Sequence, residues 1–460
     1  MSPTNTHQLR LRAPRAFSRK LTLAAAGLLA AACAPDATGT DEQERADSRG
    51  AELGGYGGSP VTEWVDHSLD TVRVEETPTP EAARLYAMVT AAMFDGVNGI
   101  DRAWGIGYES AVVEPAGAPA FASRSAAAVG AAHTVLSEFA DAHQSALDEA
   151  RARDLEALGG VADPFVENGL IWGEEVGQAV VAERADDGSQ EPDIIPGGDE
   201  PGEHRADFNR AYADMDPFVI DDKAPYLQGP PPALTSLEYA EAVEDVYIYG
   251  KDDGDPEREA LAAHYHTPAG TIRPTGVWIQ AGLQLAEQQG TTHSLSRTAR
   301  LMAQLGMAIA DTVLPIWEDK GEYHFWRPYD AITEADTDGN PHTHPDPDWE
   351  TRYGNKGGSG EYTSGFSAFS AASAVVFDNF YCSDRISFCF ETDNAKEILC
   401  YDDVYEAAFD AGRSRIYQGV HFEFTNQISR EVGLGVGDEV VQNALQPIDW
   451  GQPWSCDGQF

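Results

Sequence analysis

The sequence predicts an all-α fold. Apolar residues recur at helical spacing over long stretches, whereas runs that alternate apolar and polar side chains, as half-buried strands do, are scarce. Stretches rich in proline and glycine at 186–234 and 336–360 separate the helical segments. These stretches are long for plain connections, and loops of that length often carry binding groups, so we expect part of a functional site in them.

Residues 1–33 have the parts of an export signal. Five basic residues are followed by an apolar run from Leu21 to Ala32, which ends in small residues. Cys33 follows the sequence Leu-Ala-Ala-Ala, which loosely resembles the box at which bacterial lipoproteins are cut and lipidated. We therefore expect an exported protein, which is either a periplasmic or cell-surface lipoprotein anchored at Cys33 or a secreted protein.

The rest of the chain is expected to form a tether and two helical parts. Residues 34–60 are acidic and rich in glycine, which predicts a solvated tether. A helix is expected from Thr79, which can cap it, with Pro80 in its first turn and an apolar face made by Leu85, Met88, Val89, Ala92 and Val97. Similar periodicities predict helices near 120–153, 164–186, 235–247, 272–289, 294–316, 364–380 and 427–445. We assign an N-terminal helical part to 61–234 and a C-terminal helical part, which carries the site, to 235–460.

The charge of the chain excludes one large class of partners. Acidic residues number 76 against 31 basic ones, for a formal net charge of -45 at pH 7. Nucleic acid and anionic membrane surfaces repel such a protein. We therefore expect no nucleic-acid partner, and contact with a membrane only through a lipid anchor at Cys33. The oligomeric state is open.

Four cysteines besides Cys33 are expected to form disulfides, because an exported chain meets oxidising conditions. Closeness in sequence favours a bond between Cys382 and Cys389, which leaves Cys400 for Cys456. The spacings between the four residues lack the tight pairs that are typical of a structural zinc site.

Three segments in the last third of the chain collect groups that bind an oxyanion. The first runs from Lys320 to Arg327-Pro328, the second contains Ser364-Gly365, and the third runs from Ser414-Arg415 to His421. Arginines make forked hydrogen bonds to oxyanion oxygens, and lysine supplies a compact positive charge. A Ser-Gly pair at the start of a helix offers a cap and an approachable backbone N–H at the positive end of the helix dipole.

These three blocks resemble the vanadium-dependent haloperoxidases and the related phosphatases of the type 2 phosphatidic acid phosphatase superfamily. The match is a lysine, six residues and Arg-Pro, then a Ser-Gly helix start, then Ser-Arg, three residues, Gly, one residue and His, in the order of the family. The segments FWRPYDAITEADTDGNP and WVDHSLDTVRVEETPTPEAARLYAMVTAAMFDGVNGID resemble the haloperoxidase branch in particular. The resemblance implies packed helical bundles and a vanadate cofactor held by Lys320, Arg327, Ser364, Gly365, Arg415 and His421, with His421 as the axial ligand of vanadium.

The resemblance also implies a reaction. A haloperoxidase of this kind oxidises a halide with hydrogen peroxide to a hypohalous equivalent, and Lys320, Arg327, Arg415 and His421 are its expected catalytic residues. A small organic acceptor is an additional expected partner. Two alternatives stay open, namely a phosphoesterase that uses His421 as its nucleophile and a catalytically weak descendant that only binds oxyanions.

Two positions depart from the family pattern. Phe366 stands where the family has an acid–base histidine, and Thr425 stands where it usually has an aspartate that orients the ligating histidine. Loss of general acid–base help should slow the reaction, and iodide and bromide, which are easily oxidised, should suffer least. We expect His324, Trp326, Phe366 and Thr425 to surround the oxyanion, with Thr425 or Asn426 as a substitute partner for His421. The pairs His264–His266 and His342–His344 are expected in solvated loops.

Overall fold

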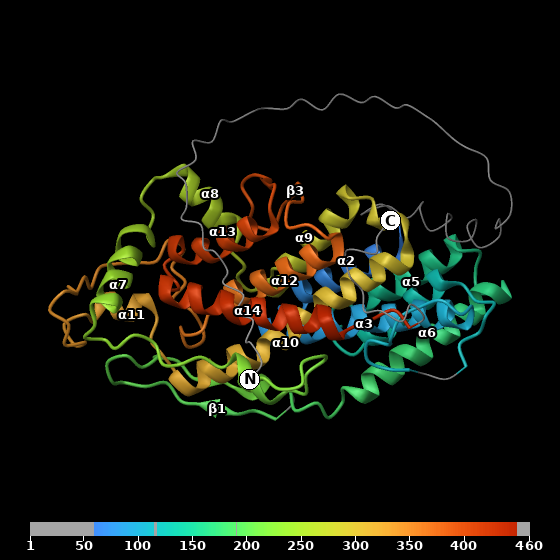
Figure 1. Ribbon diagram of the computed structural model, residues 1–460, viewed down its shortest axis with the longest axis horizontal. Coiled ribbons are helices and arrows are strands. Elements are labelled where there is room, and N and C mark those ends of the chain that lie inside the picture. Colours follow the sequence, from blue (N-terminus) through green and yellow to red (C-terminus); the bar gives the residue numbers. More distant parts are fainter. Residues whose placement is uncertain (1–58, 115–116, 190, 449–460) are drawn as a thin grey trace, which may run out of the picture. The chain divides into compact units, whose positions relative to one another are not determined.

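The structure is a computed structural model that describes residues 59–448 apart from 115, 116 and 190. The described chain is mostly helical, which confirms the predicted all-α class (Figure 1). The predicted export signal, Cys33, residues 34–58 of the predicted tether and Cys456 lie outside the described residues.

The helices and strands follow one another in an order close to the predicted one. The first half contains α2 (Pro60–Val74), α3 (Thr79–Ala103), α4 (Arg124–Leu136), α5 (Gln144–Ala157) and α6 (Pro164–Glu183). A loop region follows, with β1 (Ile194–Ile195), β2 (Phe208–Asn209) and 3-10 turns at Ala211–Asp214 and Ala224–Tyr226. The second half contains α7 (Leu237–Tyr249), α8 (Pro256–His264), α9 (Arg273–Gln288), a 3-10 turn at Thr291–His293, α10 (Leu295–Tyr323), α11 (Pro328–Thr333), α12 (Gly365–Tyr381), β3 (Phe388–Phe390), β4 (Leu399–Tyr401), α13 (Val404–Tyr417) and α14 (Glu423–Asn443).

The strands form two small antiparallel pairs, β1 with β2 and β3 with β4. Both are short, and their buried aromatic residues Phe208, Phe388, Phe390 and Tyr401 pack into the hydrophobic core of the helical body. Within the described residues, we find no helix whose length and apolar character would let it cross a lipid bilayer.

Several boundaries differ from the expected ones for local reasons. Helix α2 begins at Pro60, because the side chain of Ser59 accepts a hydrogen bond from the N–H of Thr62 and caps the helix there. In α3 the capping position belongs to Pro78, whose backbone is extended, and Thr79 is the first helical residue. The segment predicted as one helix near 120–153 is two helices, α4 and α5, and periodicity did not predict helices α2, α8, α11 and α13.

Close packing of helices fixes the frame around α12, whose first turn belongs to the site. Figure 1 shows α10, α12 and α14 side by side in the middle of the described chain. A Cβ atom at Gly433 of α14 would lie 2.0 Å from the carbonyl oxygen of Ala368 in α12. Glycine at this position therefore lets the two helices touch backbone to backbone, and any larger residue would push α12 away from α14.

Helix α10 runs through the core. Its apolar residues Met302, Leu305, Ile309 and Val313, which recur at helical spacing, are fully buried. The helix continues to Tyr323, so Lys320 lies in its last turn rather than just past its end. The backbone of His324 then takes a left-handed conformation, with φ of 40°, which ends the helix and turns the chain toward Arg327.

The disulfide prediction was wrong. The structure pairs Cys389 with Cys400, so neither Cys382–Cys389 nor Cys400–Cys456 forms. The reason is the hairpin of β3 and β4, whose antiparallel register sets Cys389 directly opposite Cys400. Closeness in sequence is a poor guide here, because the strand register decides which cysteines face each other.

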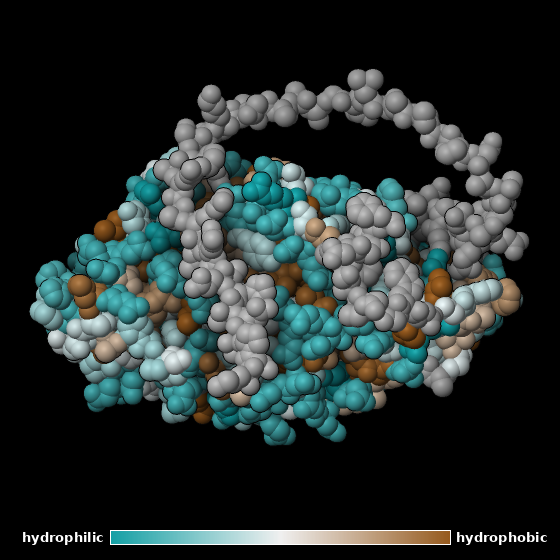
Figure 2. Space-filling view, viewed as in Figure 1, coloured by the Kyte–Doolittle hydropathy of each residue, from teal (hydrophilic) through white to brown (hydrophobic). Residues whose placement is uncertain are grey.

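The surface is strongly hydrophilic. The face drawn in Figure 2 is mostly teal, with apolar residues scattered over it. This distribution fits a chain with 76 acidic residues and a formal charge of -45.

Candidate oxyanion site

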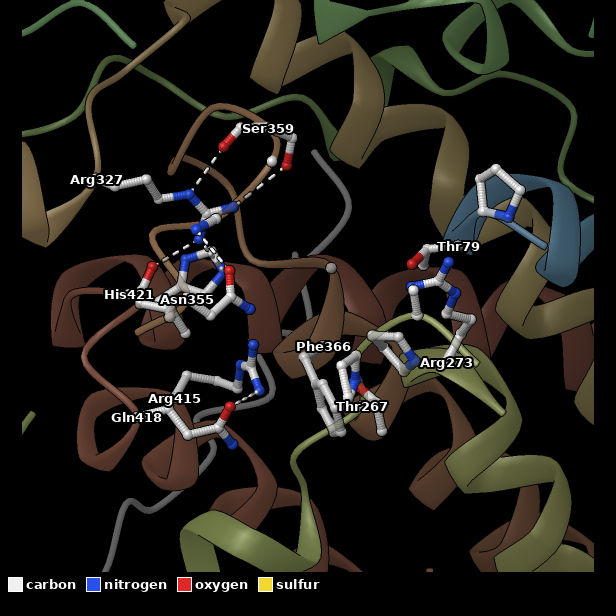
Figure 3. Close-up of a pocket in the computed structure, with 18 of the residues that line it drawn as sticks. Thr79, Thr267, Arg273, Arg327, Asn355, Ser359, Phe366, Arg415, Gln418 and His421 are labelled. Atoms are coloured by element: carbon white, nitrogen blue, oxygen red, sulfur yellow. Dashed lines mark hydrogen bonds between the residues drawn. The ribbon is translucent and has the colours of Figure 1, made fainter. Parts of the chain in front are cut away.

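The structure brings most of the residues predicted to bind an oxyanion to one cavity of about 720 Å³. They come from four different places in the fold: the last turn of α10, the start of α11, the start of α12, and the end of α13 with the turn after it. The residues of the predicted set that line the cavity are Lys320, Arg327, Gly365, Arg415 and His421. Figure 3 shows Arg327 and His421 in contact, with Arg415 nearby.

The turn that presents His421 depends on a glycine. Gly419 has φ of 79°, a conformation that side chains other than glycine rarely adopt. A Cβ atom there would also lie 2.5 Å from the carbonyl oxygen of Gly250. The turn between α13 and α14 can therefore pack against the end of α7 and carry His421 into the cavity only with glycine at this position.

The three cations of the site are neutralised by no carboxylate in an ion pair within the described part of the chain. Lys320 donates to the carbonyl oxygen of Gly360, and Arg415 donates to the side-chain oxygen of Gln418 at 2.8 Å. Arg327 donates to the carbonyl oxygens of Ser359 at 2.8 Å and of Val420 at 2.6 Å, and to the hydroxyl of Ser359 at 3.2 Å. These neutral acceptors orient the side chains, and carboxylates such as Glu361 act on Lys320 and Arg327 only from beyond ion-pair distance.

The positive charges of this cluster favour binding of an anion. Burial lowers the pKa of Lys320 well below its usual value, and the charge of Arg327 lowers it further. Burial also lowers the pKa of Arg327 to about 10 and that of Arg415, with a further contribution from Arg327, to about 9. The Nε of Arg415 is buried and has no hydrogen-bond partner among the described residues. A tetrahedral oxyanion would relieve the mutual repulsion and supply the missing acceptor.

The wall of the cavity has the opposite charge to the chain as a whole. Among the described residues that line it, none is Asp or Glu, and the cations are Arg273, Lys320, Arg327 and Arg415. The chain has 76 acidic residues and 31 basic ones, so the composition of the cavity wall differs from that of the whole chain. The cavity is therefore a positively charged compartment that attracts anions.

The orientation of His421 is set by Glu361, a residue that sequence reasoning missed. The Nδ1 of His421 lies 2.9 Å from Oε1 of Glu361, which also accepts the backbone N–H of Phe422 at 2.9 Å. The hydroxyl of Thr425 donates to Oε2 of Glu361 at 2.7 Å. All three partners act as donors, a pattern that an ionised carboxylate satisfies and a protonated one would not.

This pattern fixes the tautomer of His421. Its Nδ1 carries the proton, and its Nε2 accepts a hydrogen bond from Arg327 at 3.0 Å. Burial lowers the pKa of His421 well below its usual value, and the neighbouring charge of Arg327 lowers it further, so the ring is neutral. The lone pair of Nε2 would become available to a ligand in the cavity when Arg327 turns its donor to that ligand.

Glu361 itself is fully buried, and burial raises its pKa to about 7, an effect that the charge of Arg327 opposes. The aspartate that Thr425 replaces is therefore compensated by a carboxylate from another part of the chain. Asn426, the other expected substitute, donates to the carbonyl oxygen of Gly412 and accepts from Ser367, so it does not contact His421. No local pattern in the sequence marks Glu361, because it follows a loop and lies 60 residues before His421.

Ser364 has the expected capping role but lies behind the cavity wall. Its hydroxyl accepts the N–H of Ser367, as the sequence predicted for the start of α12, and its own N–H donates to Ser429 at 2.7 Å. The residues after it, Gly365 and Phe366, line the cavity, and their N–H groups lie in the first turn, where no intrahelical acceptor exists. The backbone of α12 is thus the part of this segment that faces an oxyanion.

Phe366 presents an apolar ring where the family pattern has a histidine. The guanidinium of Arg415 lies over this ring, 4.9 Å from its centre, and Tyr265 packs edge-on against it with ring centres 5.7 Å apart. Phe366 therefore shields Arg415 and supports its position, and it has no proton to exchange.

Three residues expected around the oxyanion, His324, Trp326 and Thr425, do not line the cavity. The ring of His324 packs edge-on against His204, and its nitrogens are buried without a hydrogen-bond partner among the described residues. Trp326 is fully buried in a separate aromatic cluster. Neither side chain can exchange protons with a guest in the cavity.

The loop histidines are only partly as expected. His342 and His344 are exposed. The prediction of a solvated His264 was wrong, because the sequence did not reveal α8, whose last residue is His264, buried against Tyr265 and Phe390. His266 stacks on Tyr353 with ring centres 4.2 Å apart and lines the cavity.

Comparisons with known proteins agree with the fold. The family model described as the VCPO second helical-bundle domain matches residues 300–449. A bacterial vanadium-dependent iodoperoxidase structure is similar with a TM-score of 0.69 at 20% identity, over 84% of this chain and 96% of that chain. A holo-type bacterial vanadium-dependent chloroperoxidase is similar with a TM-score of 0.61 at 15% identity, over 79% of this chain and 91% of that chain. No curated protein sequence matches this chain.

The matched segment contains every residue predicted to hold the oxyanion, from Lys320 to His421. The helical body beyond it shares the fold of the bacterial enzymes. Residues 300–449 thus match the second helical-bundle domain of that family, and the chain as a whole has the fold of the bacterial vanadium-dependent haloperoxidase structures.

Proposed function

We propose that this protein binds vanadate and uses hydrogen peroxide to oxidise bromide or iodide to a hypohalous equivalent. The observation that carries the proposal is the cluster of Lys320, Arg327 and Arg415 around His421, whose Nε2 contacts Arg327, in a cavity without acidic wall residues. Such a cluster fits an oxyanion of tetrahedral shape that also accepts one nitrogen ligand.

Each group has a part in holding the cofactor. Lys320, Arg327 and Arg415 would neutralise the oxygens, the first N–H groups of α12 at Gly365 and Phe366 would add neutral donors, and His421 would ligate through Nε2. Bound vanadate would activate hydrogen peroxide for attack by the halide without changing its own oxidation state. The cations stabilise the negative charge that develops on oxygen, which is usually the largest electrostatic contribution of such sites.

The departures from the family pattern bear on the substrate. Phe366 cannot donate or accept a proton, so protons must reach the reacting oxygens from water in the cavity, and the rate should be lower than with a histidine there. Iodide and bromide need the least driving force for oxidation. The similarity to a structure described as an iodoperoxidase supports the same preference.

The cellular location is also a proposal. The signal-like residues 1–33 support export, with Cys33 as a lipid anchor or with release of the protein. The disulfide between Cys389 and Cys400 fits an oxidising compartment. Mass spectrometry of the mature N-terminus distinguishes a lipidated Cys33 from a free one.

Vanadium retention and halide oxidation test the function separately. Purified protein is loaded with orthovanadate, and unbound vanadate is removed. Elemental analysis then measures bound vanadium, and peroxide-dependent formation of triiodide and bromination of phenol red measure halide oxidation. Arg415→Met should reduce vanadium retention by tenfold or more, since it removes one of three charge-assisted contacts. Arg413→Met is the matched control, because Arg413 lies on the same helix but pairs with Asp245 outside the cavity.

The outcomes distinguish the alternatives. Retained vanadium without oxidation of any halide would leave only a weak oxyanion-binding descendant. Hydrolysis of p-nitrophenyl phosphate by the vanadate-free protein would favour a phosphoesterase, although Phe366 offers no proton to a leaving group. Equal vanadium retention by the two arginine variants would contradict the proposed site.

A further inference from the structure

The cavity is much larger than an oxyanion requires. An oxyanion of five heavy atoms needs roughly 150 Å³ if each atom takes about the volume of a water molecule, ~30 Å³. The cavity holds about 720 Å³, which lies within the range of pockets that bind organic molecules. Peroxide and a halide would occupy a small part of the remainder.

The cavity has two ends with different neighbours. Figure 3 shows Arg327 and His421 at one end, Arg273 and Thr79 at the other, and Phe366 with Thr267 between them. The first end is the oxyanion site. The second end, which we call the outer end, is formed by the starts of α3 and α9 and the loop at 266–269.

Arg273 gives the outer end its own positive charge. Its Nε donates to the carbonyl oxygen of Thr77 at 2.7 Å, and its Nη2 donates to the carbonyl oxygen of Glu76 at 2.9 Å. No carboxylate lies within ion-pair distance of Arg273 in the part of the chain that the structure describes. The guanidinium is thus held in place by neutral acceptors while its charge and its Nη1 remain available for a ligand.

Aromatic side chains line the cavity. Phe208 and Trp317 pack together with ring centres 6.2 Å apart, and both border the cavity along with Phe366 and Phe369. These surfaces suit an apolar or aromatic body rather than a hydrated ion.

We propose that the outer end binds an aromatic carboxylic acid, with its ring against these aromatic side chains and its carboxylate on Arg273. This inference rests on the proposed function, because the bound acid would be the organic acceptor of the oxidised halogen. In the net reaction hydrogen peroxide, bromide, a proton and an aromatic C–H give an aromatic C–Br and two molecules of water. The halide supplies the electron pair that reduces the peroxide O–O bond, and the ring proton leaves to water.

Charge decides in favour of an acid over a neutral or cationic acceptor. The oxyanion engages Lys320, Arg327 and Arg415 at its own end, which leaves Arg273 as the remaining cation of a wall without Asp or Glu. A cationic ligand would meet repulsion along the whole cavity, and a neutral one would leave Arg273 without an anionic partner.

Binding of a probe acid to vanadate-loaded protein tests the inference. The probe is 4-hydroxybenzoate, the neutral analogue is 4-hydroxybenzyl alcohol, and the measurement is isothermal titration calorimetry. The wild type should bind the acid more tightly than the alcohol. Arg273→Gln should weaken binding of the acid by about tenfold or more, because it removes a charge-assisted contact, and should leave binding of the alcohol unchanged.

Two further variants control the result. Arg273→Lys keeps the positive charge and should retain most of the affinity, which guards against a misfolded Arg273→Gln, and thermal unfolding checks both variants. Arg297→Gln is the matched control, because Arg297 is an exposed arginine whose guanidinium lies over Phe380, away from the cavity. It should leave the affinity for the acid unchanged.

Three results would overturn the inference: equal affinity of wild type and Arg273→Gln for the acid, equal affinity of the wild type for acid and alcohol, or displacement of the acid by orthovanadate. Displacement would mean that the acid occupies the oxyanion site instead. Formation of triiodide by wild-type protein without any acceptor tests the proposed function independently, so the two failures remain distinguishable.

Discussion

Because the carboxylate of Glu361 accepts a hydrogen bond from His421, we expect that a carboxylate introduced at another position beside His421 can replace it. Glu361→Ala removes the acceptor of three donors, at distances of 2.9, 2.9 and 2.7 Å, and frees the imidazole to rotate or change tautomer. Loss of a residue that orients a metal-ligating histidine typically weakens metal affinity or activity by about tenfold to a hundredfold. This corresponds to roughly 1.4–2.7 kcal/mol.

The rescue uses the contact between Thr425 and Glu361. Because the hydroxyl of Thr425 lies 2.7 Å from Oε2 of Glu361, a carboxylate introduced by Thr425→Asp comes close to the same donors. In the Glu361→Ala background, Thr425→Asp should recover at least tenfold of the lost vanadate affinity. Thr425→Val alone removes one hydrogen bond to Glu361 and leaves the His421 contact, so its effect should be smaller than that of Glu361→Ala.

The assay is equilibrium dialysis against orthovanadate with elemental analysis of vanadium, accompanied by thermal unfolding of each variant. The reasoning would be refuted if Glu361→Ala bound vanadate as the wild type does. It would also be refuted if Thr425→Asp restored the melting temperature but not the vanadate affinity, since Glu361 would then only stabilise the fold.

Three more predictions concern proton transfer, acid stability and the disulfide. Phe366→His should raise the rate of bromide oxidation by about a hundredfold or more, because general acid–base help contributes roughly 10²–10⁴; an unchanged rate at full vanadium occupancy would show that proton transfer does not limit turnover. Burial lowers the pKa of His204 from 6.5 to about 3, so below pH 6.5 the unfolded chain binds a proton that the folded chain does not bind. The folded state is therefore destabilised relative to the unfolded state as the pH falls from 6.5 toward 3. His204→Phe should therefore remove up to about 3 kcal/mol of this destabilisation at pH 4, measured by urea unfolding. His342→Phe, at an exposed position, is the control and should not change the acid sensitivity. Equal acid sensitivity of the two variants would contradict the assigned role of His204. The double variant Cys389→Ser, Cys400→Ser should lower the unfolding free energy by about 3 kcal/mol, since it opens a loop with a sequence separation of 11, and an unchanged denaturation midpoint would speak against that role.

The sequence by itself determined the helical class and identified the group of residues that we propose to bind an oxyanion. The stripe of α10 repeats at helical spacing because one face of the helix is buried, and this local pattern is readable without a structure. Lys320, Arg327, Arg415 and His421 were predicted as a group because their spacing within three short blocks matched a family, and the structure gathers them at one cavity.

Only the tertiary structure decided which distant groups complete the site. Glu361 lies against His421, and Arg273 shares the cavity with the oxyanion ligands, because α9, α10, α12 and the α13–α14 turn pack together. The register of a hairpin likewise selected Cys389–Cys400. Periodicity and motif spacing record what a segment does locally, whereas contacts between segments depend on how helices pack across the whole chain, which leaves no local signature.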